Sequence, residues 1–150
     1  MAEIRHRVGV RAPAAEVYRA LTTAEGVGGW WATGTSGDGG AGGRLAAPFP
    51  PVAEPYLLDV LAAEPDAHVR WRVAQGPDEW LGTEIDFALR AAGEFTVVLF
   101  RHEGWAEPVE FLHHCSTKWA TFLLSLRDLV EDCTGRPWPR DLKIDDWDRA

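Results

Sequence analysis

The stretch His114–Thr134, HCSTKWATFLLSLRDLVEDCT, decides the fold of this chain, because its apolar residues recur at alternating steps of four and three. The positions on this pattern are Cys115, Trp119, Phe122, Leu126, Leu129 and Cys133. At about 100° per residue they form one face of a helix, and the opposite face is polar. Gly135 stands where a left-handed residue would close the helix, and Pro137 and Pro139 prevent its continuation.

The length of this helix indicates what must cover it. A helix of about 20 residues is roughly 30 Å long. One neighbouring helix cannot cover so long an apolar stripe in a chain of 150 residues, so we expect a sheet to pack against it. The two cysteines lie roughly 27 Å apart on the same helix face. No disulfide can join them there, and we expect both to be buried thiols.

The composition is that of one globular domain with an unusual aromatic content. With 46% hydrophobic and 25% charged residues, we predict a single domain over 1–150. Eight tryptophans carry a large apolar surface that must be buried in a core or used in a pocket. A net charge of −8 argues against nucleic acid and anionic membranes as partners. Without a signal sequence or a long apolar stretch, we expect a cytoplasmic protein with no membrane insertion.

The chain before the long helix reads as strands with two short helices near its beginning. Alternation with a period of two covers residues 3–11, 56–63, 67–74, 84–90 and 96–101. Pro13 can begin one short helix, and Thr22 and Thr23 can cap a second that runs toward Trp30 and Trp31. Strands in sequence joined by short turns predict an antiparallel sheet, and hence an α+β fold.

Two segments are compatible with more than one structure. The glycine-rich residues 32–43 can form a hairpin or a mobile loop, and they match no phosphate-binding fingerprint. Residues 141–150, which are acidic and contain Trp147, can either fray or dock on the domain. Asp86 shares the parity of Glu84 and alternates with Ile85, so we expect it on the outer face of the sheet.

Several segments resemble the START-like SRPBCC superfamily. They are APAAEVYRALT (12–22), the Gly29-Trp30-Trp31 step, WLGTEIDFAL (80–89), HEGW (102–105) and the apolar positions of the helix from Trp119 to Leu126. The branch they resemble most is that of the bacterial homologues of the C-terminal domain of the heat-shock-protein-90 ATPase activator. This resemblance spans about residues 3–139. It implies a helix-grip fold, in which a curved antiparallel sheet wraps around the long C-terminal helix and leaves a deep apolar cavity.

The resemblance implies that the protein binds a small hydrophobic or aromatic molecule, such as a lipid or polyketide-like compound, in that cavity without turning it over. The candidate ligand-binding residues are Trp30, Trp31, Trp71, Trp80, Phe87, His102, Trp105, Trp119 and Phe122. For any one ring, packing in the core is the stronger interpretation. The set as a whole favours the wall of a pocket.

Two other functions stay open. A co-chaperone role would make a chaperone protein the partner, and a homodimer is compatible with the sequence. A polyketide cyclase or aromatase-like enzyme would need a general acid or base, for which His102 is the best candidate. Cys115 lies in the apolar stripe and should be inert. Adjacent residues such as His113 and His114 diverge on a helix, so we expect neither a metal site nor a cofactor.

Overall fold

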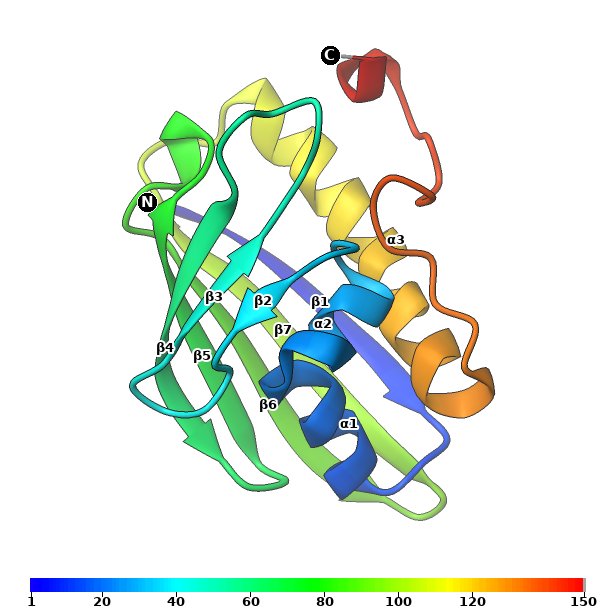
Figure 1. Ribbon diagram of the computed structural model, residues 1–150. Helices are drawn as coiled ribbons and strands as arrows, with labels where there is room; N and C mark the ends of the chain where they lie inside the picture. The colour runs from blue at the N-terminus through cyan, green and yellow to red at the C-terminus, as the bar shows by residue number, and fades with distance from the viewer. Residues whose placement is uncertain (150) are drawn as a thin grey trace.

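The computed structural model describes residues 1–149 and has the predicted α+β fold, with a curved antiparallel sheet facing one long helix (Figure 1). The elements in chain order are β1 (Ala2–Val10), α1 (Ala14–Thr22), α2 (Ala24–Trp30), β2 (Ser36–Gly37), β3 (Arg44–Ala47), β4 (Tyr56–Glu64), β5 (His68–Gln75), η1 (Asp78–Trp80), β6 (Glu84–Ala92), β7 (Phe95–Trp105), α3 (Glu110–Asp132) and η2 (Asp146–Arg149). None of the helices within residues 1–149 has the length and apolar character needed to cross a membrane.

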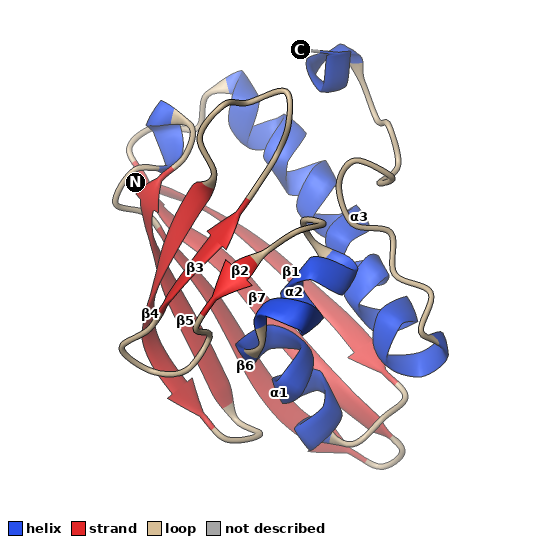
Figure 2. Ribbon diagram, viewed as in Figure 1, coloured by secondary structure: helices blue, strands red, loops and turns tan. Residues whose placement is uncertain are grey.

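The sheet has seven strands in the order β1-β7-β6-β5-β4-β3-β2, and every neighbouring pair is antiparallel. The glycine-rich segment forms a hairpin, because Ser36 and Gly37 of β2 pair with Ala46 and Leu45 of β3. Figure 2 shows α1, α2 and α3 on the same side of the sheet. The apolar face of the sheet is therefore covered by helices, and the other face meets solvent.

Side chains alternate along the strands, so that apolar residues lie on the inner face of the sheet and polar residues on the outer face, as predicted. Trp71 of β5 is opposite Ile85 of β6, and both are fully buried under the helices. Arg70 is opposite Asp86, and both lie on the outer face. Asp86 has the orientation that the sequence indicates, but it is only 5% exposed because Arg70 and His68 cover it. The outer face therefore buries a carboxylate within an ionic network.

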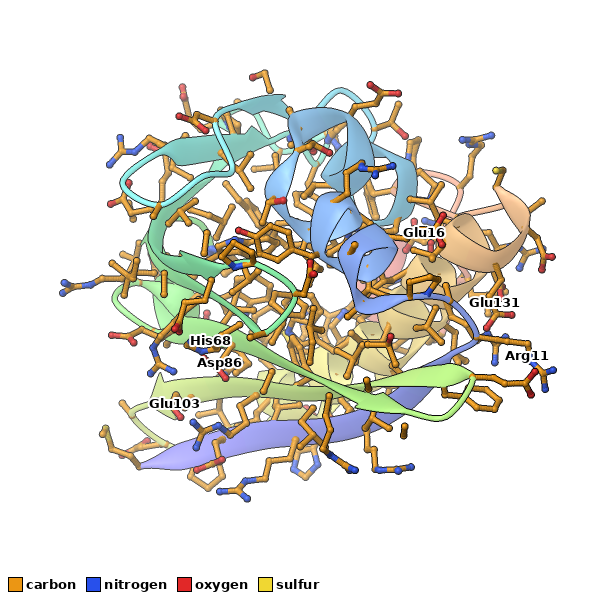
Figure 3. All side chains as sticks on the ribbon, turned by 90° about the horizontal axis from the view of Figure 1, so that it is seen from below. Arg11, Glu16, His68, Asp86, Glu103 and Glu131 are labelled. Atoms are coloured by element: carbon orange, nitrogen blue, oxygen red, sulfur yellow. The ribbon has the colours of Figure 1, made fainter. Side chains whose placement is uncertain are left out.

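This network is centred on Arg70, whose guanidinium binds Asp86 at 2.9 Å and also pairs with Glu84 and Glu103. His68 Nε2 lies 2.5 Å from Asp86 Oδ1 (Figure 3). Burial disfavours a charge on His68, but the carboxylates beside it outweigh burial and raise its pKa. The network joins three adjacent strands by charge-assisted hydrogen bonds, which fix their register.

The long helix α3 differs from its prediction at both ends. It begins at Glu110, four residues before His114, and ends at Asp132. Cys133, with φ of 57°, is the left-handed residue that closes the helix, so the prediction that Gly135 has this role is wrong. Cys133 is exposed at this turn, and only Cys115 is the buried thiol that was predicted for both cysteines.

Gly135 is required for a different reason. A Cβ atom at Gly135 would lie 2.0 Å from the carbonyl oxygen of Gly29 in α2. The chain reverses at Cys133 and runs back along the helix, where Arg136 N–H donates to Ser125 Oγ at 2.6 Å. Gly135 therefore allows a close approach of two backbones rather than a left-handed turn.

Residues 135–147, which we call the C-terminal segment, dock on the domain. Trp138 N–H donates to Trp31 O at 2.8 Å, and Thr33 N–H donates to Trp138 O at 3.1 Å. Farther along, Asp141 pairs with Lys118 of α3. The segment thereby lies between α3 and the loop that precedes β4.

Candidate functional site

The centre of the interface between helix and sheet is filled by four stacked indole rings. Trp71 of β5 stacks on Trp31, Trp31 on Trp119 of α3, and Trp119 on Trp80, with ring centroids 5.8, 5.5 and 5.8 Å apart. Phe87 meets the edge of Trp71 at 5.0 Å. Tryptophan side chains bury large surfaces, so this region is a packed core rather than an open space. We call these four rings the tryptophan stack.

His102 lies beside the tryptophan stack, fully buried, with both ring nitrogens in hydrogen bonds. Trp119 Nε1–H donates to His102 Nδ1 at 3.1 Å, which leaves the proton of the neutral ring on Nε2. Nε2–H then donates to Thr83 Oγ1 at 2.8 Å, and this hydroxyl donates to Trp80 O at 2.6 Å. Burial lowers the pKa of His102 to about 3. His102 is therefore a neutral bridge between α3 and the sheet at physiological pH.

A cavity of about 190 Å³ lies next to the tryptophan stack, at the N-terminal half of α3. Its walls come from five parts of the chain: Trp31 directly after α2, the loop before β4 with the start of β4, η1, α3 and the C-terminal segment. The lining residues are Trp31, Phe49, Pro51, Val52, Tyr56, Trp80, Phe111, His114, Cys115, Lys118, Trp119, Phe122, Trp138 and Trp147. We call this space the aromatic cavity.

The candidate ligand-binding residues fall into two groups. Those that line the aromatic cavity are Trp31, Trp80, Trp119 and Phe122. Those that lie elsewhere in the core are Trp30, Trp71, Phe87, His102 and Trp105. Trp30 illustrates the second group, because its indole N–H is bonded to Ala20 O at 2.9 Å and its ring packs edge-on to Phe87. The structure thus brings four of the nine candidates to one cavity.

Residue patterns in the sequence did not predict the walls of the aromatic cavity that come from loops. Phe49 and Tyr56 flank a proline-rich loop, and their rings pack with centroids 4.4 Å apart. Trp138 donates from Nε1 to Pro50 O at 2.7 Å, which closes the C-terminal segment against this loop. Neither stretch has a helical or strand period. A signal for these walls was the aromatic content of the two segments, because loops usually carry polar residues.

The basic side chains at the cavity, Lys118 and His114, have acidic partners in the C-terminal segment. Lys118 Nζ, on a side chain that is nearly buried, pairs with Asp141 and donates to Leu142 O at 2.7 Å. His114 Nδ1 lies 2.9 Å from Asp145 Oδ2, and this hydrogen bond lowers the pKa of Asp145. The cation of Lys118 also lies 5.5 Å from the centre of the Phe122 ring. These pairs hold the C-terminal segment to α3.

The remaining polar groups of the cavity are neutral at physiological pH. Burial raises the pKa of the Tyr56 hydroxyl to about 12 and that of the Cys115 thiol to about 12. Among residues 1–149, Trp80 Nε1–H is buried with no acceptor within hydrogen-bond distance. Its proximity lowers the pKa of the Cys115 thiol by less than burial raises it. A thiol with so high a pKa is a weak nucleophile. The cavity is thus apolar, with a few neutral hydrogen-bonding groups.

Comparison with known proteins places this chain in a family. The family model of the activator of Hsp90 ATPase homolog 1-like proteins matches residues 11–131. The chain belongs to this family. The solution structure of the Aha1 dimer from Colwellia psychrerythraea is 39% identical to it, covers 90% of this chain and 100% of that one, and superimposes with a TM-score of 0.81. No curated protein sequence matches significantly.

More distant structures show the fold alone. A protein from Staphylococcus saprophyticus is 16% identical, with 89% of this chain and 95% of that one covered and a TM-score of 0.74. CalU16 from Micromonospora echinospora is 20% identical, with 87% and 85% covered and a TM-score of 0.68. The C-terminal segment lies beyond residues 11–131, so Trp138 and Trp147 add walls that the family model does not include.

Proposed function

We propose that the protein binds a small aromatic molecule in the aromatic cavity. The observation that supports this proposal is a space of about 190 Å³ whose walls are mostly aromatic rings. An engineered apolar cavity of about 150 Å³ takes up benzene, whereas pockets for drug-sized ligands measure about 300–1,000 Å³. The volume therefore favours a ligand with one ring over a lipid or a polycyclic polyketide.

The expected affinity follows from the size of such a ligand. Small ligands gain between about 0.3 and 1.5 kcal/mol per non-hydrogen atom. A ligand of about eight such atoms would then gain between about 2.4 and 12 kcal/mol, which corresponds to a Kd between roughly 20 mM and 2 nM. Because the unfolded chain has no cavity, ligand at a hundred times Kd should stabilise the fold by about 2.7 kcal/mol.

Titration with toluene tests this function. Toluene should change the tryptophan fluorescence, since Trp31, Trp80 and Trp119 line the cavity, and it should raise the melting temperature. Phe122→Ala should enlarge the cavity and shift the preference toward two-ring ligands such as naphthalene. Leu124→Ala is the matched control, because Leu124 is 40% exposed on the opposite face of α3. Toluene that changes neither fluorescence nor melting temperature at its solubility limit contradicts the proposal.

A second function is supported by the family of the chain. Its 39% identity to a protein named Aha1 favours stimulation of the ATPase of an Hsp90 chaperone. The test is the ATPase rate of a bacterial Hsp90 homologue with increasing amounts of this protein. A rate that stays constant at tenfold molar excess would exclude this role for that chaperone.

The same relative supports a homodimer, since it is a dimer in solution. Light scattering coupled to gel filtration should then give twice the monomer mass of 16.6 kDa. A mass equal to that of the monomer at the concentration of the ligand titrations would contradict the dimer. It would leave the binding function unaffected, because every residue that lines the aromatic cavity belongs to one chain.

A further inference from the structure

Building on the proposed function, we infer that the ligand of the aromatic cavity is a neutral one-ring molecule with an acceptor oxygen, and that this oxygen receives the hydrogen bond of the Tyr56 hydroxyl. Aromatic ketones, esters and ethers have this chemistry. The inference rests on the placement of Tyr56, on the pairing of the charges around it and on the size of the cavity.

The ring of Tyr56 is held in one place by its neighbours. Tyr56 begins β4, where it pairs with Ala47 of β3. Its ring lies 4.4 Å from that of Phe49, 5.5 Å from that of Trp80 and 6.4 Å from that of Trp31, measured between centroids. Two of these contacts are edge-to-face. A ring fixed in this way presents its hydroxyl in a defined direction, which lowers the entropy cost of a hydrogen bond to a ligand.

The Tyr56 hydroxyl has no hydrogen-bond partner among residues 1–149, although its side chain is partly buried at the cavity. Trp80 Nε1 also lacks a partner among these residues, but it is fully buried, whereas the Tyr56 oxygen is not. It is therefore accessible. A hydroxyl at an apolar wall gains free energy when it finds an acceptor. A ligand in the cavity can supply that acceptor.

The charges around the cavity favour a neutral ligand. The cation of Lys118 is matched by the carboxylate of Asp141, and His114 is bonded to Asp145. The pKa values of Tyr56 and Cys115, each raised to about 12 by burial, keep both groups protonated. An anionic ligand would thus lose its hydration, while the cation of Lys118 at the cavity is already matched by the carboxylate of Asp141.

The test compares three probes of nearly the same shape: acetophenone, α-methylstyrene, in which a CH₂ group replaces the carbonyl oxygen, and benzoate. The protein variant is Tyr56→Phe, which keeps the ring and removes the hydroxyl. The matched control is Tyr18→Phe, because Tyr18 of α1 is the only other tyrosine and does not line the cavity. Kd values come from tryptophan fluorescence and from ligand-observed NMR.

Tyr56→Phe should weaken acetophenone binding by about tenfold and change α-methylstyrene binding by less than about twofold. Tyr18→Phe should change neither. Benzoate should bind the wild-type protein at least about tenfold more weakly than acetophenone. Equal effects of Tyr56→Phe on acetophenone and α-methylstyrene would overturn the role of the hydroxyl. Tighter binding of benzoate than of acetophenone would overturn the neutral class.

A measurement on the wild-type protein keeps the test decisive if the variant does not fold. The carbonyl stretch of bound ¹³C-labelled acetophenone should lie at lower frequency than in an apolar solvent, because it accepts a hydrogen bond. An unshifted stretch overturns the inference. Binding of α-methylstyrene with an unshifted acetophenone carbonyl would remove this inference and leave the proposed function intact. Failure of both uncharged probes to bind would overturn both.

Discussion

The tryptophan stack and the aromatic cavity lie side by side on the same helix, and they are built from the same residue types. In the stack, Trp31 faces Trp71 of β5, Trp119 faces Trp31 and Trp80 of η1, and the space is filled. In the cavity, Trp31 and Trp119 face Tyr56 and the C-terminal segment, and about 190 Å³ stays open. Aromatic content therefore does not determine whether a region is core or site. What decides it is whether the opposing segment brings enough side-chain volume to close the gap.

The rigidity of the two regions should differ for the same reason. The stack is supported by His102, Thr83 and the strands behind them, so its rings are fixed on several sides. The outer wall of the cavity depends on loops and on a few ion pairs with α3. Substitutions in the stack should thus cost far more stability than substitutions at the outer wall of the cavity.

Trp119→Ala should have the largest effect. Trp119 is 1% exposed, stacks on Trp31 and Trp80, and donates the hydrogen bond to His102 Nδ1. Truncation should lower the free energy of unfolding by about 3–5 kcal/mol, measured by urea denaturation. A loss below about 1 kcal/mol would show that the stack is not the rigid region.

Acid should weaken the stack through His102. Its folded-state pKa of about 3 lies below the unfolded value near 6.5, so the unfolded chain takes up the proton first as the pH falls. Stability from the neutral ring is therefore complete above pH 6.5 and is lost between pH 6.5 and 3. Between pH 6.5 and 4.5 the loss should be roughly 2–3 kcal/mol, and His102→Gln should lack this part of the pH dependence. Equal pH slopes for the two proteins would refute the neutral bridge.

Gly135→Ala tests how tightly the far end of α3 is packed. The new methyl group would lie 2.0 Å from Gly29 O, so two backbones must separate, at a cost of about 2 kcal/mol. Gly28→Ala is the control, because its nearest neighbour would be 3.7 Å away and alanine favours the helix. If both variants melt at the wild-type temperature, the close approach of α2 and Gly135 is not required.

Trp147→Ala should have the smallest effect on stability, although it removes the same side chain as Trp119→Ala. Trp147 is 42% exposed and packs on Phe111 and His114 at the cavity. The loss should stay below about 1 kcal/mol. The affinity for acetophenone should fall a few-fold, since one wall is removed. A stability loss as large as that of Trp119→Ala would erase the distinction between stack and cavity wall.

Much of the fold could be predicted because periodicity is a local property. Alternation placed Trp71, Ile85 and Phe87 on the inner face, and the steps of four and three placed Trp119 and Phe122 on the helix face that is buried. The end of α3 was less accurate. A left-handed conformation at Cys133 depends on where the returning chain packs, and this contact with α2 has no local signal.

The sequence by itself determined most of the helices and strands, the faces that they bury and the family of the chain, since these depend on residue spacing along the backbone. Only the tertiary structure decided that His102 is a bridge between Trp119 and Thr83, and that Tyr56 and the C-terminal segment enclose a cavity. The reason is physical. A cavity is the small difference between the space that the backbone encloses and the volume of the side chains that fill it. Because these side chains come from segments that are distant in sequence, the spacing of residues in any one segment does not reveal that difference.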